Sequence, residues 1–151
     1  MNHTYSFTGA WHLPADRDVV FAALERLDHY PLWWPQVRRA ERLDDDTCNV
    51  VVRSTLPYDL RMTAHRVDAD RDRGVLRARL TGDLAGFTGW HLVPTSDGTR
   101  AEFHERVEVH RPLLRWLAVA RPAFRANHAW MMRCGQRGLR HHLLLRPRSE
   151  G

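Results

Sequence analysis

The sequence predicts a two-layer α+β fold, in which a curved, seven-stranded antiparallel sheet wraps around one long C-terminal helix. Residues 37–110 hold β-like runs separated by short turn signals, so consecutive strands must pair antiparallel, because parallel strands need a long crossover. After residue 110 the pattern becomes helical, with one apolar and one arginine-rich face. The 151 residues suffice to bury a core without a metal or disulfide.

The N-terminal segment is expected to supply one strand and two helices. Residues 5–11 alternate large apolar with small or polar residues, which is typical of a half-buried strand. Asp16 can cap a following helix, whose apolar positions recur at helical spacing at Val19, Val20, Ala23, Leu24 and Leu27. A second, short helical turn is expected over 28–34, where Pro35 closes it.

Six more strands are expected, near 37–43, 48–56, 60–69, 74–81, 86–93 and 99–110. Pro112 and Pro122 each stand where a helix can begin, which predicts a short helix over 112–120 and a longer one over 122–145. Because a curved sheet around one helix rarely fills completely, the space between them is expected to form an apolar cavity. We expect residues 1–151 to form a single ligand-binding domain, with its core at about 4–145.

Composition excludes several classes of protein. All 23 basic residues are arginine, and with 18 acidic residues they give a net charge of +5. Most of this excess follows residue 110, so the chain has no general basic coat, and nucleic acid is not an expected partner. Two distant cysteines indicate neither a disulfide framework nor a zinc site, which favours a reduced, cytoplasmic setting. No signal peptide or membrane span is apparent, no metal or cofactor is expected, and monomer and homodimer both remain open.

Three segments carry a family resemblance. The element order, together with the aromatic and proline-rich segment 28–35, His65-Arg66-Val67 and the closing-helix segment 127–132, resembles the START-like or SRPBCC superfamily. Within it, the chain looks most like the bacterial polyketide cyclase/dehydrase and lipid-transport group. The resemblance covers roughly 4–145 and implies the helix-grip fold with an interior pocket for a hydrophobic polyketide, lipid or isoprenoid-like molecule.

Arg66 is the position that matches the inward arginine of aromatase/cyclases in this superfamily, where it is thought to polarise a polyketide carbonyl. The tyrosine that accompanies it would fall near Val37 here, a departure that removes a candidate proton donor. Independently of the resemblance, alternation over 60–69 puts Arg66 on the more apolar face of its strand, shared with Leu60, Met62, Ala64 and Asp68. A guanidinium there could bind a carboxylate, phosphate or enolate, or instead reach solvent or pair with Asp68 or Glu105.

Glu105 and His128 are the other two candidate catalytic residues. Glu105 lies on an otherwise apolar strand face, where it could act as a general acid or base or pair with Arg66 or another arginine. His128 interrupts the apolar face of the closing helix beside Asn127, and histidine is the residue type most often used for acid/base chemistry. Both helix residues could hydrogen-bond a ligand, or could instead be satisfied by neighbouring protein groups.

Large aromatic side chains and methionines are expected to complete the binding site, although residues at these spacings also fill ordinary cores. The expected lining consists of Trp34, Met62, Arg66, Trp90, Phe103, Asn127, His128 and Met131, with Trp116 as a further aromatic candidate.

Three functions follow as hypotheses. The first is a binding protein for a hydrophobic small molecule. The second is a polyketide cyclase, aromatase or dehydratase, in which Arg66 stabilises an enolate while His128 or Glu105 moves protons. The third is an interaction module that uses the arginine-rich C-terminal helix.

Overall fold

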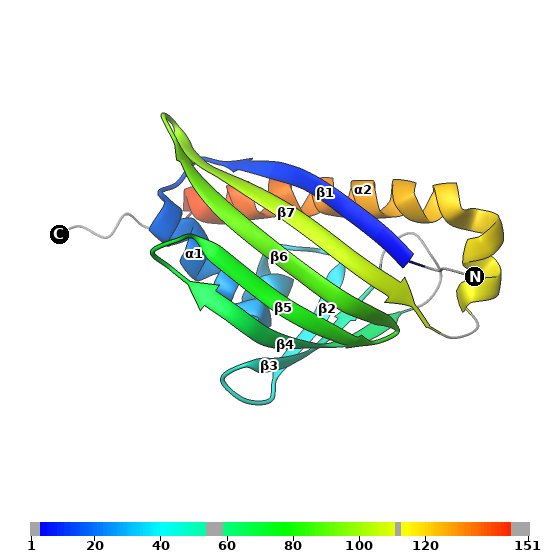
Figure 1. The fold of residues 1–151 in the computed structure, drawn as a ribbon. Helices are drawn as coiled ribbons and strands as arrows, with labels where there is room; N and C mark the ends of the chain where they lie inside the picture. Colours follow the sequence, from blue (N-terminus) through cyan, green and yellow to red (C-terminus); the bar gives the residue numbers. More distant parts are fainter. Residues whose placement is uncertain (1–3, 54–58, 111–112, 146–151) are drawn as a thin grey trace.

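The computed structural model describes residues 4–53, 59–110 and 113–145. For 113–120 it describes the backbone of the helix only. Figure 1 shows the elements in order along the chain. They are β1 (Thr4–Leu13), α1 (Arg17–Glu25), the 3-10 helix η1 (Leu27–Leu32), β2 (Val37–Arg42), β3 (Thr47–Val52), β4 (Leu60–Asp70), β5 (Val75–Gly82), β6 (Leu84–Thr95), β7 (Gly98–Val109) and α2 (Leu113–Leu145).

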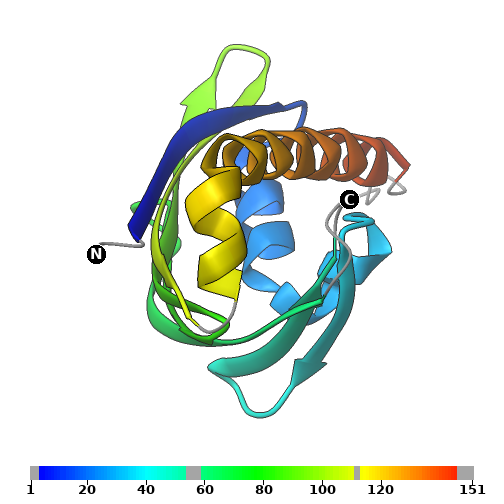
Figure 2. The same cartoon turned by 90° about the vertical axis from the view of Figure 1, so that its right-hand side faces the viewer.

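The strands form one antiparallel sheet in the order β1-β7-β6-β5-β4-β3-β2. Every neighbour pair except β1 and β7 is consecutive in the chain, as expected for antiparallel strands that follow one another in the sequence. The sheet curves around the helices (Figure 2), so that α1, η1 and α2 all lie on its concave side. The predicted helix-grip architecture, with seven strands and a long C-terminal helix, is therefore confirmed.

The closing helix differs from the prediction in one respect. Instead of two helices that begin near Pro112 and Pro122, α2 is one helix with Pro122 inside it. A proline lacks the N–H that the helix interior needs, so the break was a reasonable expectation. The helix instead continues past Pro122 and changes direction along its length, as Figure 2 shows. The arginines of its arginine-rich face, Arg125, Arg133, Arg137 and Arg140, are all exposed.

Strand β4 also departs from simple alternation. Its register shifts between Arg66 and Asp68, which is the sign of a β-bulge. Arg66 lies opposite Ala78 before the shift, whereas Asp68 lies opposite the exposed Arg77 after it. The expectation that Asp68 shares the cavity face is therefore wrong, because the extra residue reverses the alternation.

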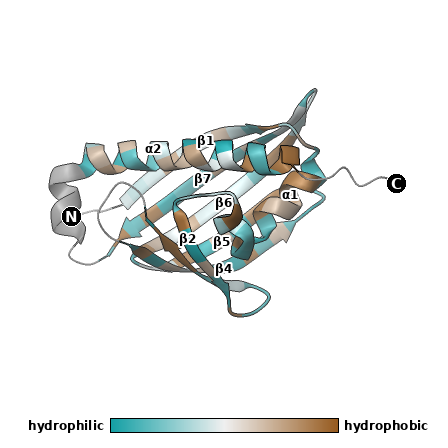
Figure 3. Ribbon diagram, turned by 180° about the vertical axis from the view of Figure 1, so that it is seen from behind, coloured by the Kyte–Doolittle hydropathy of each residue, from teal (hydrophilic) through white to brown (hydrophobic). Residues whose placement is uncertain are grey.

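The main core lies where the segment after η1 meets α2. Trp11, Trp33 and Trp34 are buried there, and Trp34 packs against Trp11 with ring centroids 5.2 Å apart. Gly138 and Gly135 allow the close approach, since a Cβ on Gly138 would lie 1.7 Å from the Trp33 carbonyl oxygen. The colouring of α2 in Figure 3 alternates between polar and apolar, as an amphipathic helix requires.

Candidate functional site

A cavity of about 480 Å³ separates the concave sheet face from α1, η1 and α2. This volume is ordinary for a small-molecule site, which typically holds a few polar groups within an apolar wall. Most of the wall is aliphatic or aromatic, including Leu24, Val50, Leu60, Leu76, Leu80 and Phe124. The expected apolar cavity between sheet and helix is therefore present.

Three polar side chains of the wall lie in one row across the sheet. Arg66 of β4 faces Ala78 of β5, Ala78 faces Thr88 of β6, and Thr88 faces Glu105 of β7. All four residues line the cavity. Because neighbouring strands are about 4.8 Å apart, three strand spacings separate Arg66 from Glu105 by about 14 Å measured along the sheet. We call these four residues the polar row.

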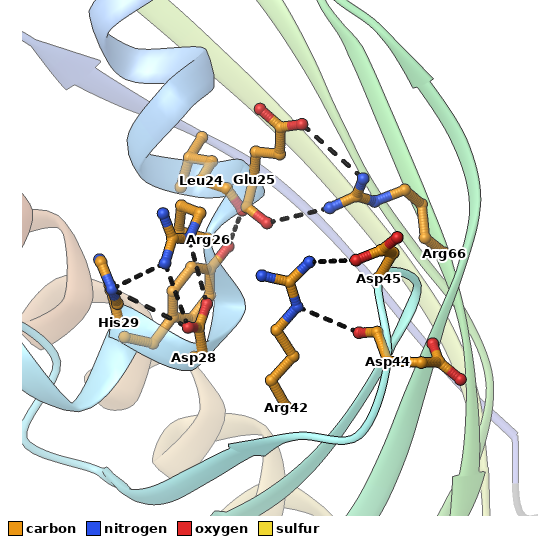
Figure 4. A network of polar contacts seen from close by, with 10 residues as sticks. Leu24, Glu25, Arg26, Asp28, His29, Arg42, Asp44, Asp45 and Arg66 are labelled. Carbon is orange, nitrogen blue, oxygen red and sulfur yellow. Dashed lines mark hydrogen bonds and ion pairs between the residues drawn. The ribbon is translucent and has the colours of Figure 1, made fainter.

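Arg66 stands at the mouth of the cavity, where Figure 4 shows its guanidinium turned toward Glu25 of α1. One terminal nitrogen lies 3.7 Å from a Glu25 carboxylate oxygen and 3.9 Å from Asp46, and the other donates a 3.4 Å hydrogen bond to the Glu25 carbonyl. The side chain is 32% exposed, so these long contacts are solvated and contribute little. Expected pairing with Asp68 or Glu105 is absent; the partners come from α1 and the β2–β3 loop instead.

The rest of the mouth is also charged. Arg42 pairs with Asp45 at 2.7 Å across the β2–β3 loop, and Arg26 donates to Asp28 at 3.3 Å beside η1. This hydrogen bond from Arg26 holds the pKa of Asp28 below its usual range. The cavity thus leads from an apolar interior to a rim of alternating charges (Figure 4).

Glu105 and His128 meet at the other end of the polar row. His128 Nε2 lies 3.3 Å from Glu105 Oε2, and the two side chains are only 9% and 17% exposed. Phe7 stacks on the imidazole with ring centroids 3.6 Å apart and planes 11° from parallel. Glu105 therefore pairs with a histidine rather than with Arg66 or another arginine. The pair is largely shielded from solvent within the cavity wall.

The other predicted lining residues are mostly where the sequence places them. Trp34, Met62, Trp90, Asn127 and Met131 line the cavity, together with Arg66 and His128. The indole N–H of Trp34 donates to the Met131 carbonyl at 3.0 Å, which fixes the ring against α2. The side chain of Trp116 lies outside the described residues.

Phe103 is the exception among these predicted ligand contacts. It does not line the cavity; its ring lies over Gly9 of β1, where a Cβ would come within 2.6 Å, and packs against Trp90 at 5.6 Å. Because Gly9 has no side chain, the space over β1 is free for the Phe103 ring. The spacing of apolar residues along one strand does not reveal such a cross-strand contact.

Sequence reasoning missed two buried polar groups of the wall, Tyr30 and Cys48. The Tyr30 hydroxyl donates to the Leu24 carbonyl at 2.7 Å and accepts a hydrogen bond from Trp90, and burial raises the pKa of Tyr30. Burial likewise raises the pKa of the Cys48 thiol to about 11. The position of Tyr30 in the aromatic segment 28–35 could have indicated that it lines the site. The sequence around Cys48 contains no comparable indication.

Two further findings concern other kinds of site. Among the residues that the structure describes, no group of three or more His, Cys, Asp or Glu side chains is arranged to hold a metal ion. In the same part of the chain, no helix is both long and apolar enough to span a membrane.

Comparison with known proteins identifies the family. A model of the polyketide cyclase/dehydrase and lipid transport family matches residues 4–143. The chain belongs to this family. A comparison with curated proteins finds no significant match.

Several solved structures share the fold of this chain. A Thermus thermophilus protein, TTHA0849, has a TM-score of 0.78 at 16% identity, over 93% of this chain and 97% of that one. The aromatase/cyclase ZhuI from a Streptomyces species, R1128, has a TM-score of 0.76 at 17% identity, over 99% of both chains. A START superfamily protein from Mycobacterium smegmatis has a TM-score of 0.58 at 18% identity, over 89% and 98%. Family membership and fold together support hydrophobic-ligand binding or a polyketide cyclase-like role.

Proposed function

We propose that this protein binds an elongated, mostly apolar molecule that carries oxygen-bearing groups near both ends. The observation that carries the proposal is the polar row, which puts Arg66 and the Glu105–His128 pair at opposite sides of one apolar cavity. An apolar wall supplies affinity, while a few placed polar groups fix orientation. Polyketides and oxygenated lipids have this chemistry.

The two ends suit different groups. Arg66 offers donors to an anionic or enolate oxygen at the mouth, because its ion pairs of 3.7 and 3.9 Å leave the guanidinium loosely held. Glu105 and His128 together can both accept and donate a proton, which suits a hydroxyl or carbonyl at the inner end. Ala78 and Thr88 lie between them and leave room for the body of the molecule.

Cavity binding can be tested with the fluorescent anion 1-anilinonaphthalene-8-sulfonate. Ala78→Trp should weaken its binding at least tenfold, because the indole would fill the middle of the polar row. Ala129→Trp is the matched control, since Ala129 is exposed on α2. Equal binding by both variants would exclude the cavity as the site.

The role of Arg66 needs a separate pair of probes. Arg66→Gln should weaken the sulfonate dye several-fold and leave the neutral dye N-phenyl-1-naphthylamine unchanged. Arg71→Gln is the control, because Arg71 also lies 3.7 Å from Glu25 but does not line the cavity. If both dyes respond alike, Arg66 shapes the mouth and does not select an anionic group.

The shielded Glu105–His128 pair favours a second candidate function, a cyclase or dehydratase acting on a poly-β-ketone. The pair would move a proton at the inner end of the substrate, while Arg66 would bind a different, distant oxygen. Arg66 turns toward Glu25 and lies three strands from Glu105, so the two would act on oxygens that are far apart in the substrate. Turnover of a synthetic poly-β-ketone thioester should fall at least a hundredfold in His128→Asn, with dye binding retained. Unchanged turnover would remove His128 as the proton carrier.

A further inference from the structure

The outer face of the sheet, on the side away from α2, carries an unusual cross-strand arrangement. Four side chains lie opposite one another on adjacent strands: His65 on β4, Arg79 on β5, Phe87 on β6 and Arg106 on β7. All four are exposed, and Phe87 is 55% exposed although it is a large apolar residue. We call these residues the outer row.

The two arginines of the outer row are available for a partner. Neither Arg79 nor Arg106 has a carboxylate within 4 Å among the described residues. Both stand on central strands of the sheet, so the backbone holds their Cα atoms at a fixed separation. Unpaired guanidinium groups are well suited to bidentate contacts with carboxylates.

Phe87 adds an apolar centre between these two cations. Aromatic residues, phenylalanine included, and arginine are enriched in protein–protein interfaces relative to the rest of the surface. Beside the row, the same face has a shallow hollow whose lining includes Gly9, Arg77, His91 and His104. The hollow offers space for a side chain of the partner.

The acidic residues on this face decide the class of partner. Glu102, Glu108 and Asp68 stand beside the row, and Glu102 lies within 4 Å of Arg100 and His91. An extended polyanion, such as a nucleic acid strand or an anionic bilayer, would place negative charge against these carboxylates as well. A folded protein can present carboxylates to the arginines alone and neutral groups to the border.

We propose that the outer row is a docking site for an acidic protein surface in which carboxylates flank an apolar side chain. Arg79 and Arg106 are two strand spacings apart, about 9.6 Å. Glutamates at positions i and i+7 of a helix are separated by about 10.5 Å along its axis, which matches this distance. An apolar residue between them would cover Phe87. Docking there leaves the cavity uncovered, because Arg66 and Ala78 line it on the opposite face of the same strands.

The test uses the full chain and a designed helical peptide with glutamates at i and i+7 and leucine at i+3. A matched peptide carries glutamine at the two acidic positions. Fluorescence anisotropy should show at least tenfold tighter binding of the glutamate peptide, weakened as salt increases. Arg79→Glu combined with Arg106→Glu should abolish this preference. Arg133→Glu with Arg140→Glu, an equal charge change on exposed positions of α2, should alter it less than twofold.

Phe87→Ser should weaken the glutamate peptide several-fold without altering the salt dependence, because the substitution changes no charge. Should the reversed variant fail to fold by circular dichroism, Arg79→Gln with Arg106→Gln replaces it. Equal binding of both peptides, or equal effects of the sheet and helix variants, would overturn the proposal. So would tighter binding through these arginines of oligouridylate or of phosphatidylserine vesicles. None of these outcomes bears on the cavity, so the proposed ligand-binding function is judged separately.

Discussion

Replacing Gly138 by alanine should destabilise the fold, although alanine is the better helix former. Ideal geometry puts the new Cβ 1.7 Å from the Trp33 carbonyl oxygen and 2.9 Å from its carbon. Real Cβ atoms essentially never come closer than 3.0 Å to another heavy atom, so one segment must retreat by at least 1.3 Å (3.0 − 1.7). The obstacle is backbone, which cannot move aside as a side-chain end can. Trp33 is also held by its N–H, which donates to the Tyr30 carbonyl at 3.2 Å.

The expected size follows from two opposed effects. Overpacking a well-filled interior costs about 1–3 kcal/mol, and a rigid obstacle places this site at the upper end. Alanine in place of glycine in a helix returns about 1 kcal/mol. The net loss is therefore about 2 kcal/mol, which lowers the melting temperature of a chain of this size by roughly 4–8 °C.

Urea and thermal unfolding measured by circular dichroism would check this value. Arg140→Ala on the exposed face of α2 is the control and should stay within about 0.5 kcal/mol of the parent protein. Gly135→Ala should cost less than Gly138→Ala, because its Cβ meets the rings of Trp34 and Trp11 rather than backbone. A higher melting temperature for Gly138→Ala would refute the close packing of α2 on Trp33.

Three further results are expected. The folded-state pKa of Tyr30 lies above its unfolded value of 10.0. The contribution of Tyr30 to stability is therefore complete below pH 10 and is lost at higher pH. Between pH 9 and 11.5, the urea midpoint should fall less steeply in Tyr30→Phe than in the parent protein. Iodoacetamide at pH 8 should modify Cys134 before Cys48, because Cys48 is buried and its pKa is about 11. A dye bound in the cavity should slow the modification of Cys48 further, since Cys48 lines the cavity. Mass spectrometry that finds Cys48 modified first would contradict its burial. Arg26 lowers the pKa of Asp28. The stability that the Asp28 carboxylate contributes is therefore present at pH values above its unfolded-state pKa, and it is lost as the pH falls through the lower folded-state pKa. In Arg26→Ala, an NMR titration should show the pKa of Asp28 rising toward 3.8, and no rise would exclude Arg26 as the cause.

The sequence predicted most of the fold because its elements leave local signals. Turn residues separate the strands, and alternation identified the inward face of β4 as far as Arg66. The two departures have local causes that the pattern does not display: a bulge after Arg66 and a helix that continues through Pro122. The bulge adds a residue to β4, and α2 changes direction along its length instead of ending before Pro122.

The candidate site was less accessible from sequence, because its contacts join distant segments. Arg66, Glu105 and His128 were singled out as polar interruptions of apolar faces, and all three line the cavity. Their partners could not be predicted from the sequence. His128 meets Glu105 because its turn of α2 lies over β7, and this depends on how the helix packs on the sheet. Likewise, the packing of α1 and the β2–β3 loop decides that Arg66 meets Glu25 and Asp46. Whether these residues bind a ligand or catalyse a reaction stays a prediction.

The polar row also shows how this chain could diversify. The bonds that hold β4, β5, β6 and β7 together run through the backbone and do not depend on which side chain points into the cavity. Ala78 and Thr88 can therefore be exchanged for larger, smaller or more polar residues while the ladders stay intact. Changes at these two positions alter the length and polarity of the space between Arg66 and Glu105. The shape of the cavity can thus change at two positions while the scaffold stays the same.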